Sequence, residues 1–182
     1  MRWLLLLGVA LVAGCGGDGG GSEATTGLEQ GPTIAGFGFT NGSAVADGKP
    51  IDVRFTCDGE NVSPALAWRG VPDGTVELAL VVEDPGTSGG IFTHWLVYGI
   101  APSATDIATG TRPGLEGKNG FAEPGYGGPC PPDGEQHHYV FRLLALHAPS
   151  ELDAGVDRAT FDAAVAPLLH AEARLTATYE RK

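Results

Sequence analysis

Most of this chain shows the hydrophobic and polar alternation that is typical of β-strands. Residues 51–57 (IDVRFTC) alternate apolar and polar side chains, which predicts a half-buried strand. Residues 76–84 (VELALVVED) are more continuously apolar and β-branched, which indicates a central strand. Similar patterns predict further strands at residues 92–100, 138–146 and 173–180. The segments between them are rich in Gly, Pro, Asn and Asp, which favour turns and irregular loops.

One stretch near the C-terminus departs from the strand pattern. Residues 157–171 (DRATFDAAVAPLLHA) are rich in alanine, with large apolar side chains near helical spacing. We expect Asp157 to cap a helix here. Pro167 lies inside the pattern, so we expect it to kink or split the helix or to begin a second short one. The sequence therefore predicts a mainly β domain with a minor helix.

The first residues have the composition of an export signal. In residues 1–14 a single basic residue precedes an apolar run, and small residues lead into Cys15. The run is shorter than the roughly 20 apolar residues that a membrane-spanning helix needs. The segment LVAGC resembles a bacterial lipobox, which implies that Cys15 is lipidated after cleavage. The alternative is an ordinary secretory signal with a coincidental cysteine.

The Gly/Ser-rich residues 15–32 cannot bury much apolar surface, so they are interpreted as a flexible tether. The remaining residues 33–182 suit a single domain with its own core. Together these segments predict an exported lipoprotein of the bacterial cell envelope, held to the membrane through Cys15.

The net charge limits the classes of binding partner, and the cysteine count suggests a disulfide. The formal charge of the whole chain is −11, and it becomes −12 once residues 1–14 and their one basic residue are removed. Such an acidic surface opposes nucleic-acid binding, so we expect no nucleic-acid partner. If Cys15 carries a lipid, Cys57 and Cys130 are left as a pair in an exported protein, and a disulfide between them is one hypothesis. Two buried free thiols are the alternative.

Two candidate site residues come from predicted strands. Asp84 continues the apolar face of its strand, where an acid needs a partner, although an aspartate that only closes a turn is a common alternative. By alternation His94 shares a face with Phe92 and Leu96. A lone histidine on an apolar face is more often a core residue than a functional one, so His94 gains interest only if another polar group meets it.

A third stretch, GYGGPCPPDGEQHHYVF (residues 125–141), joins a Gly/Pro loop to a strand. By alternation His137 and Tyr139 share one face and His138 lies on the other, so the two adjacent histidines do not form a paired metal-binding element. His137, Tyr139 and the loop backbone could together donate hydrogen bonds to a small anion.

Taken in series, FTCDGENVSPALAW, VVEDPGTSGGIFTHWLVYGI, GKNGF, GYGGPCPPDGEQHHYVFRLLAL and a helix containing His170 resemble the phosphatidylethanolamine-binding protein (PEBP) family. The closer likeness is to its bacterial YbhB/YbcL branch, also called Raf kinase inhibitor-like proteins. The resemblance implies a mainly β fold, with a central antiparallel sheet, a smaller sheet and peripheral short helices. It also implies a small pocket for phosphate, acetate or a phosphorylated head group.

Carried over position by position, the resemblance places eight residues in that pocket: Asp84, Pro85, His94, Gly128, Cys130, Pro131, His137 and Tyr139. Two departures stand out. The family's DPDAP motif is DPGTS here, so the second acid is replaced by Gly86, and Pro167 interrupts the helix before His170.

The expected function is non-catalytic or regulatory binding of a small anion or phosphorylated head group, with no cofactor. An anion beside Asp84 requires either a neutral Asp84 or a protonated His94. We favour an ionised Asp84 that hydrogen-bonds His94 and raises the pKa of its imidazole. The alternatives are an enzyme that uses Cys130 as nucleophile with His94 or His137 as base, and an inhibitor of a protein partner. A metal site is not expected, because the spacing of Asp84, His94 and His137 matches no short zinc pattern.

Overall fold

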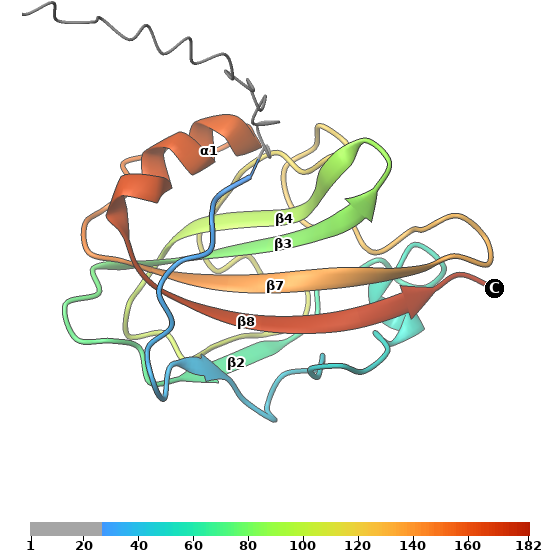
Figure 1. Ribbon diagram of the computed structural model, residues 1–182, viewed down its shortest axis with the longest axis horizontal. Coiled ribbons are helices and arrows are strands. Elements are labelled where there is room, and N and C mark those ends of the chain that lie inside the picture. Colours follow the sequence, from blue (N-terminus) through green and yellow to red (C-terminus); the bar gives the residue numbers. More distant parts are fainter. Residues whose placement is uncertain (1–26) are drawn as a thin grey trace, which may run out of the picture.

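The structure, a computed structural model, describes residues 27–182; the predicted signal, Cys15 and most of the predicted tether lie outside these residues. A central sheet lies between a helix on one face and a smaller sheet on the other (Figure 1). All named strands pair antiparallel. The predicted fold class is therefore confirmed. Within residues 27–182 no helix is long and apolar enough to span a membrane.

The central sheet has the strand order β6-β4-β3-β7-β8 and the small sheet the order β1-β2-β5. The long strands of the central sheet are β3 (Glu77–Thr87), β4 (Gly90–Ile100), β7 (Gln136–Leu146) and β8 (Leu169–Glu180), with the short β6 (Leu115–Glu116) at the edge. The small sheet contains β1 (Gly38–Phe39), β2 (Leu66–Arg69) and β5 (Asp106–Ile107). All four long strands were predicted, whereas the four short ones were not.

Both faces of the central sheet are covered, which explains the continuous apolar run of β3. Leu78, Leu80 and Val82 belong to the core between the two sheets, and Ala79 and Val81 pack on the helix side. All five are at most 1% exposed. Strands buried on both faces lose the polar alternation of a half-buried strand, as this one does.

The strand predicted at residues 51–57 is wrong. Residues Val53–Phe55 form a 3₁₀ helix instead, in which the side chain of Asp52 accepts a hydrogen bond from the backbone N–H of Arg54 at 2.9 Å. Phe55 is buried in the core between the sheets. The segment does not bury the face that alternation predicted, because Val53 is 52% exposed while Ile51 and Phe55 are buried.

The predicted helix at residues 157–171 is shorter than expected. Asp157 caps α1 (Arg158–Val165) through a 2.8 Å hydrogen bond from the Thr160 N–H, as predicted. Pro167 then lies in a 3₁₀ turn (Ala166–Leu168), and β8 begins at Leu169. His170 is therefore in a strand and not in a helix, because the proline ends the regular helical bonding.

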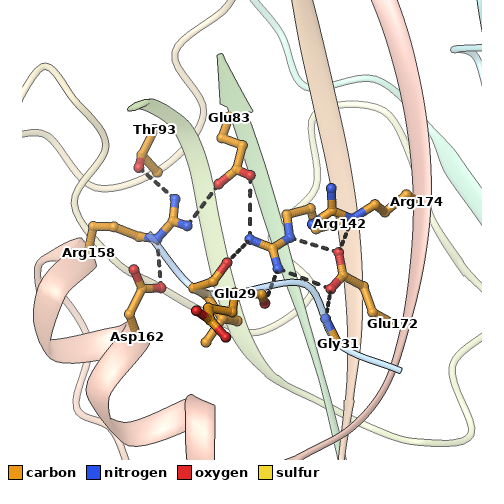
Figure 2. A network of polar contacts seen from close by, with 10 residues as sticks. Glu29, Gly31, Glu83, Thr93, Arg142, Arg158, Asp162, Glu172 and Arg174 are labelled. Carbon is orange, nitrogen blue, oxygen red and sulfur yellow. Dashed lines mark hydrogen bonds and ion pairs between the residues drawn. The ribbon is translucent and has the colours of Figure 1, made fainter. Parts of the chain in front are cut away.

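Residues 27–32 pack against the domain, which corrects the predicted tether of residues 15–32. Leu28 is buried between the central sheet and α1. The Arg142 guanidinium donates to the carbonyls of Leu28 and Glu29 at 2.8 and 2.9 Å, and the Gly31 N–H donates to Glu172 at 2.6 Å (Figure 2). The folded part thus begins before the predicted boundary at residue 33.

An ion network on the α1 side of the sheet holds this segment (Figure 2). Arg142, 1% exposed, pairs with Glu172 and Glu83, and Arg158 bridges Glu83 to Asp162 and Thr93. Burial alone would raise the pKa of Glu172, but hydrogen bonds from Arg142 and the Gly31 N–H hold that pKa below its ordinary value. Every member of the network is satisfied, which is the condition under which buried charges are tolerated.

Candidate functional site

A cavity of about 480 Å³ lies on the face of the central sheet opposite α1, near the ends of β3, β4 and β7. It is lined by six of the eight predicted pocket residues, namely Asp84, His94, Cys130, Pro131, His137 and Tyr139. We call it the site cavity. Its polar groups come from three strands and one loop that are far apart in the sequence.

Asp84 pairs with His137 across the cavity wall. The Nδ1 of His137 lies 2.6 Å from Oδ2 of Asp84, and the other carboxylate oxygen accepts the backbone N–H of Gly86 at 2.8 Å. Asp84 is 2% exposed, and it continues the apolar face of β3, as alternation predicted. The hydrogen bond to Asp84 raises the pKa of His137, in opposition to burial, and the nearby Glu135 acts in the same direction.

His94 reaches the site cavity through a β-bulge that sequence alternation does not reveal. The pairing between β3 and β4 shifts register between Val82, opposite Trp95, and Glu83, opposite Thr93. The extra residue places His94 on the cavity side with Trp95, while Leu96 packs on the α1 side. The prediction that His94 shares a face with Leu96 is therefore wrong, because a bulge redirects the side chain.

The favoured pairing of Asp84 with His94 is also wrong, since Asp84 is bonded to His137. His94 instead donates its Nδ1–H to the carbonyl of Gly127 at 2.6 Å. Its side chain is 4% exposed, and burial lowers the pKa of the imidazole. His94 is thus a neutral ring at pH 7, with Nε2 as a hydrogen-bond acceptor.

Nε2 of His94 and the hydroxyl of Tyr139 lie in the cavity wall and have no hydrogen-bond partner among residues 27–182. Their rings meet edge to face at 5.2 Å. Every fully buried side-chain N or O in the described part of the chain has a partner, so these two atoms are accessible from the cavity. Burial raises the pKa of Tyr139, which keeps its hydroxyl protonated as a donor.

The Gly/Pro loop forms another wall, held by a disulfide. Cys57 and Cys130 are bonded, with their Cα atoms 5.4 Å apart, and the Cys57 N–H donates to the carbonyl of Pro129 at 3.1 Å. This disulfide joins the cavity wall to the segment that follows the 3₁₀ helix at Val53–Phe55. Because its sulfur is bonded, Cys130 offers no thiolate nucleophile in this state.

Two predicted pocket residues do not line the site cavity. Gly128 is buried behind the wall, where its N–H donates to Asn61 at 2.8 Å and a Cβ would lie 2.5 Å from the carbonyl oxygen of Phe55. Pro85 is exposed and lines a neighbouring, more open depression beside Glu135 and His137. Gly128 supports the wall from behind, and Pro85 lies outside the site cavity.

Several lining residues were not predicted, chiefly Phe92, Phe121 and Glu135. Phe92 precedes His94 by two positions, and Glu135 precedes His137 by two, so period-two spacing is the signal that could have found both. Phe121 lies in a loop and carries no periodic signal. No group of three His, Cys, Asp or Glu residues that could hold a metal ion occurs in the part of the chain that the structure describes.

Comparisons with known proteins identify relatives of this chain. Residues 41–180 match the family model described as "Phosphatidylethanolamine-binding protein". A Mycobacterium tuberculosis protein named "Putative lipoprotein LppC" is 42% identical over 97% of this chain and 95% of its own. A UPF0098 protein of Methanothermobacter thermautotrophicus is 38% identical over 72% of this chain and 91% of its own. The crystal structure of E. coli YbcL, titled a member of the mammalian PEBP family, has a TM-score of 0.75 at 32% identity and covers 81% of this chain and 100% of its own.

Proposed function

Because this chain belongs to the phosphatidylethanolamine-binding protein family, we propose that it binds a small anionic or phosphorylated ligand in the site cavity. The observation that carries the proposal is that Nε2 of His94 and the hydroxyl of Tyr139 open into one cavity without protein partners, next to the ring of His137. Unpartnered polar atoms on a rigid concave surface are the usual basis of small-molecule recognition.

The Asp84–His137 pair allows an anion to approach a site that contains a carboxylate. When His137 is protonated, its charge offsets that of Asp84. Its Nε2–H makes only a 3.5 Å contact with the exposed Glu135, and it can donate to a ligand oxygen instead. Asp84 acts by holding Nδ1 and by raising the pKa of His137. His137 is therefore the cationic group of the site, and Asp84 is its positioning residue.

His94 and Tyr139 complete the binding surface in complementary ways. The neutral His94 accepts a hydrogen bond at Nε2, so it favours a ligand oxygen that carries a proton, such as the hydroxyl of a hydrogen phosphate. Tyr139 donates to an unprotonated oxygen. This combination suits a partly protonated phosphate or phosphate monoester better than a fully ionised one.

Binding is proposed here in preference to catalysis. The strongest nucleophile in the cavity wall would be Cys130, and its sulfur is bonded to Cys57. Among the described lining residues, no hydroxyl group is hydrogen-bonded to a base. The family membership supports the same preference.

The location is proposed to be the cell envelope, through a lipid on Cys15. The lipobox-like LVAGC and the similarity of nearly the whole chain to a protein named as a lipoprotein support this proposal. Cys15→Ser in the full-length chain should transfer the protein from the membrane fraction to the soluble fraction. An unchanged distribution would contradict anchoring through Cys15.

The proposed function is tested by calorimetric titration of phosphate and phosphorylethanolamine into residues 27–182. A whole solved relative corresponds to 81% of this chain, which supports folding without the N-terminal segment. Binding should be lost in His94→Ala and retained in His138→Ala, because His138 is exposed on the other side of β7. A folded wild-type domain that binds neither compound would overturn the proposal.

A further inference from the structure

The site cavity is larger than a bare anion needs. Cavities of about 300–1,000 Å³ hold drug-sized ligands, and one water accounts for only about 30 Å³ of liquid. At about 480 Å³ this cavity has room for a phosphate and a substituent of several carbon atoms. The remaining space lies beside aromatic and proline side chains, namely Phe92, Phe121, Pro131 and Pro132.

Two of these side chains, Phe92 and Phe121, give the cavity an aromatic end next to His94. The ring of Phe92 lies 4.9 Å from that of His94 and 4.9 Å from that of Phe121, which it meets edge to face. Phe121 is 55% exposed and is the most exposed of the large hydrophobic side chains in residues 27–182. A group bound next to His94 would therefore extend over Phe92 toward Phe121.

The loop that carries Phe121 is built to hold that ring in place. Asn119, 8% exposed, accepts the N–H groups of Phe121 and Glu123 at 2.9 and 3.3 Å and donates to the carbonyl of Gly125 at 3.1 Å. Ala122 adopts a left-handed conformation with φ of 64°. Strained non-glycine residues persist only where the surroundings determine them, and they cluster at binding sites.

Two glycines make room for the aromatic rings. A Cβ on Gly120 would lie 2.4 Å from the ring of Phe92, and a Cβ on Gly127 would lie 2.8 Å from the ring of Phe121. Both glycines also tie the loop to β4, since their N–H groups donate to the carbonyls of Thr93 and His94. The aromatic end is thus fixed to the same strand that positions His94.

We propose that the ligand of the site cavity is an anion with an apolar substituent, and that Phe121 determines specificity for that substituent. This inference rests on the proposed function, because the anionic group occupies the polar end. The substituent removes the exposed face of Phe121 from water, so it adds affinity that inorganic phosphate cannot gain. Either an aryl group or an alkyl chain would cover Phe121 in this way.

The test compares inorganic phosphate, phenyl phosphate and butyl phosphate by calorimetric titration into residues 27–182. Burial of part of a phenyl ring is worth about 1.4 kcal/mol or more, so wild-type protein should bind at least one substituted phosphate about tenfold more tightly than phosphate. Phe121→Ala should abolish that advantage, so that the variant binds all three compounds with similar affinities. Tighter binding of phenyl phosphate would indicate an aryl ligand, and tighter binding of butyl phosphate an acyl or alkyl one.

Two controls make the outcomes distinct. Val76→Ala truncates a similarly exposed apolar side chain, 47% exposed and outside the site cavity, and should keep the full preference. Phe121→Leu retains apolar volume and should keep the butyl preference while it weakens any phenyl preference. Equal affinities for all three compounds, or equal losses of all three in Phe121→Ala, would overturn the inference. If wild-type protein bound none of them, the proposed function itself would fail.

Discussion

The two faces of the central sheet use neighbouring ionisable residues in opposite ways. Glu83 turns toward α1 and enters a closed network in which Arg142 and Arg158 satisfy it (Figure 2). The next residue, Asp84, turns toward the site cavity, where it pairs with His137 beside the unpartnered polar atoms of His94 and Tyr139. The closed side holds the chain together, and the open side is available to a ligand.

The largest effect is expected on the closed side, from Arg142→Met. This change leaves Glu83 and Glu172 buried without their common partner, and breaking a buried pair costs about 3–5 kcal/mol of unfolding free energy. Denaturant unfolding measures the loss. The control is Arg54→Met, which breaks an exposed pair with Glu60 worth about 0–1 kcal/mol. Equal effects of the two changes would remove the distinction between a closed network and a surface pair.

The second effect concerns the disulfide, which supports the open side. Joint replacement of Cys57 and Cys130 by serine should lower the unfolding free energy by about 2–4 kcal/mol, because the bond joins residues 73 positions apart. It should also weaken anion binding, since the cavity wall at Cys130 loses its attachment. Arg142→Met, by contrast, should leave binding per folded molecule intact. Undiminished binding in the double serine variant would show that the wall keeps its place without the bond.

A smaller effect, chiefly on binding, is expected from His137→Gln. Hydrogen bonds to charged groups are worth about 1.5–3 kcal/mol, so phosphate affinity should fall more than about tenfold. His138→Gln is the matched control, because this adjacent histidine is exposed on the opposite side of β7 and should bind as wild type does. Similar losses in both variants would point to a general charge effect in place of a defined site.

The smallest effect is a pH dependence of the open side. The hydrogen bond to Asp84 raises the pKa of His137 above its ordinary 6.5, so the pair contributes fully to stability below about pH 6.5 and loses that contribution as the pH rises through the raised pKa. Phosphate affinity should fall over the same range. In Asp84→Asn the His137 pKa should drop and neutral-pH binding should weaken. Tighter binding in Asp84→Asn would mean that repulsion by the carboxylate outweighs its effect on His137.

The long strands and the family were predictable because their signals are local and repeated. The structure confirms three such predictions: the apolar run of β3, the shared face of His137 and Tyr139, and the Asp157 cap. The strand predicted at residues 51–57 was wrong because the apolar and polar alternation of its sequence is not followed by burial: Val53 is 52% exposed, and residues Val53–Phe55 form a capped 3₁₀ helix. The short strands β1, β2, β5 and β6 are only two to four residues long, too short for any periodicity to emerge.

The geometry of the site was less predictable than its residues. A bulge of one residue decides which face His94 occupies, and no sequence pattern reports it. The partner of Asp84 was also misassigned, because its carboxylate bonds His137 of β7 and not His94 of β4. No sequence pattern tells which of two histidines on neighbouring strands meets the acid. Phe121 and the segment at residues 27–32 owe their positions to tertiary contacts with Asn119, Gly127, Arg142 and Glu172.

The central claim is that the anion binds in the site cavity, next to His94, His137 and Tyr139, and at no other part of the surface. It is tested most directly by NMR of the five histidine rings during a phosphate titration of residues 27–182. His94 and His137 line the site cavity, whereas His138, His147 and His170 do not. The account predicts saturable shifts of the His94 and His137 ring signals, with the other three rings unchanged. Shifts that are equal across all five rings, or absent from His94 and His137, would contradict it.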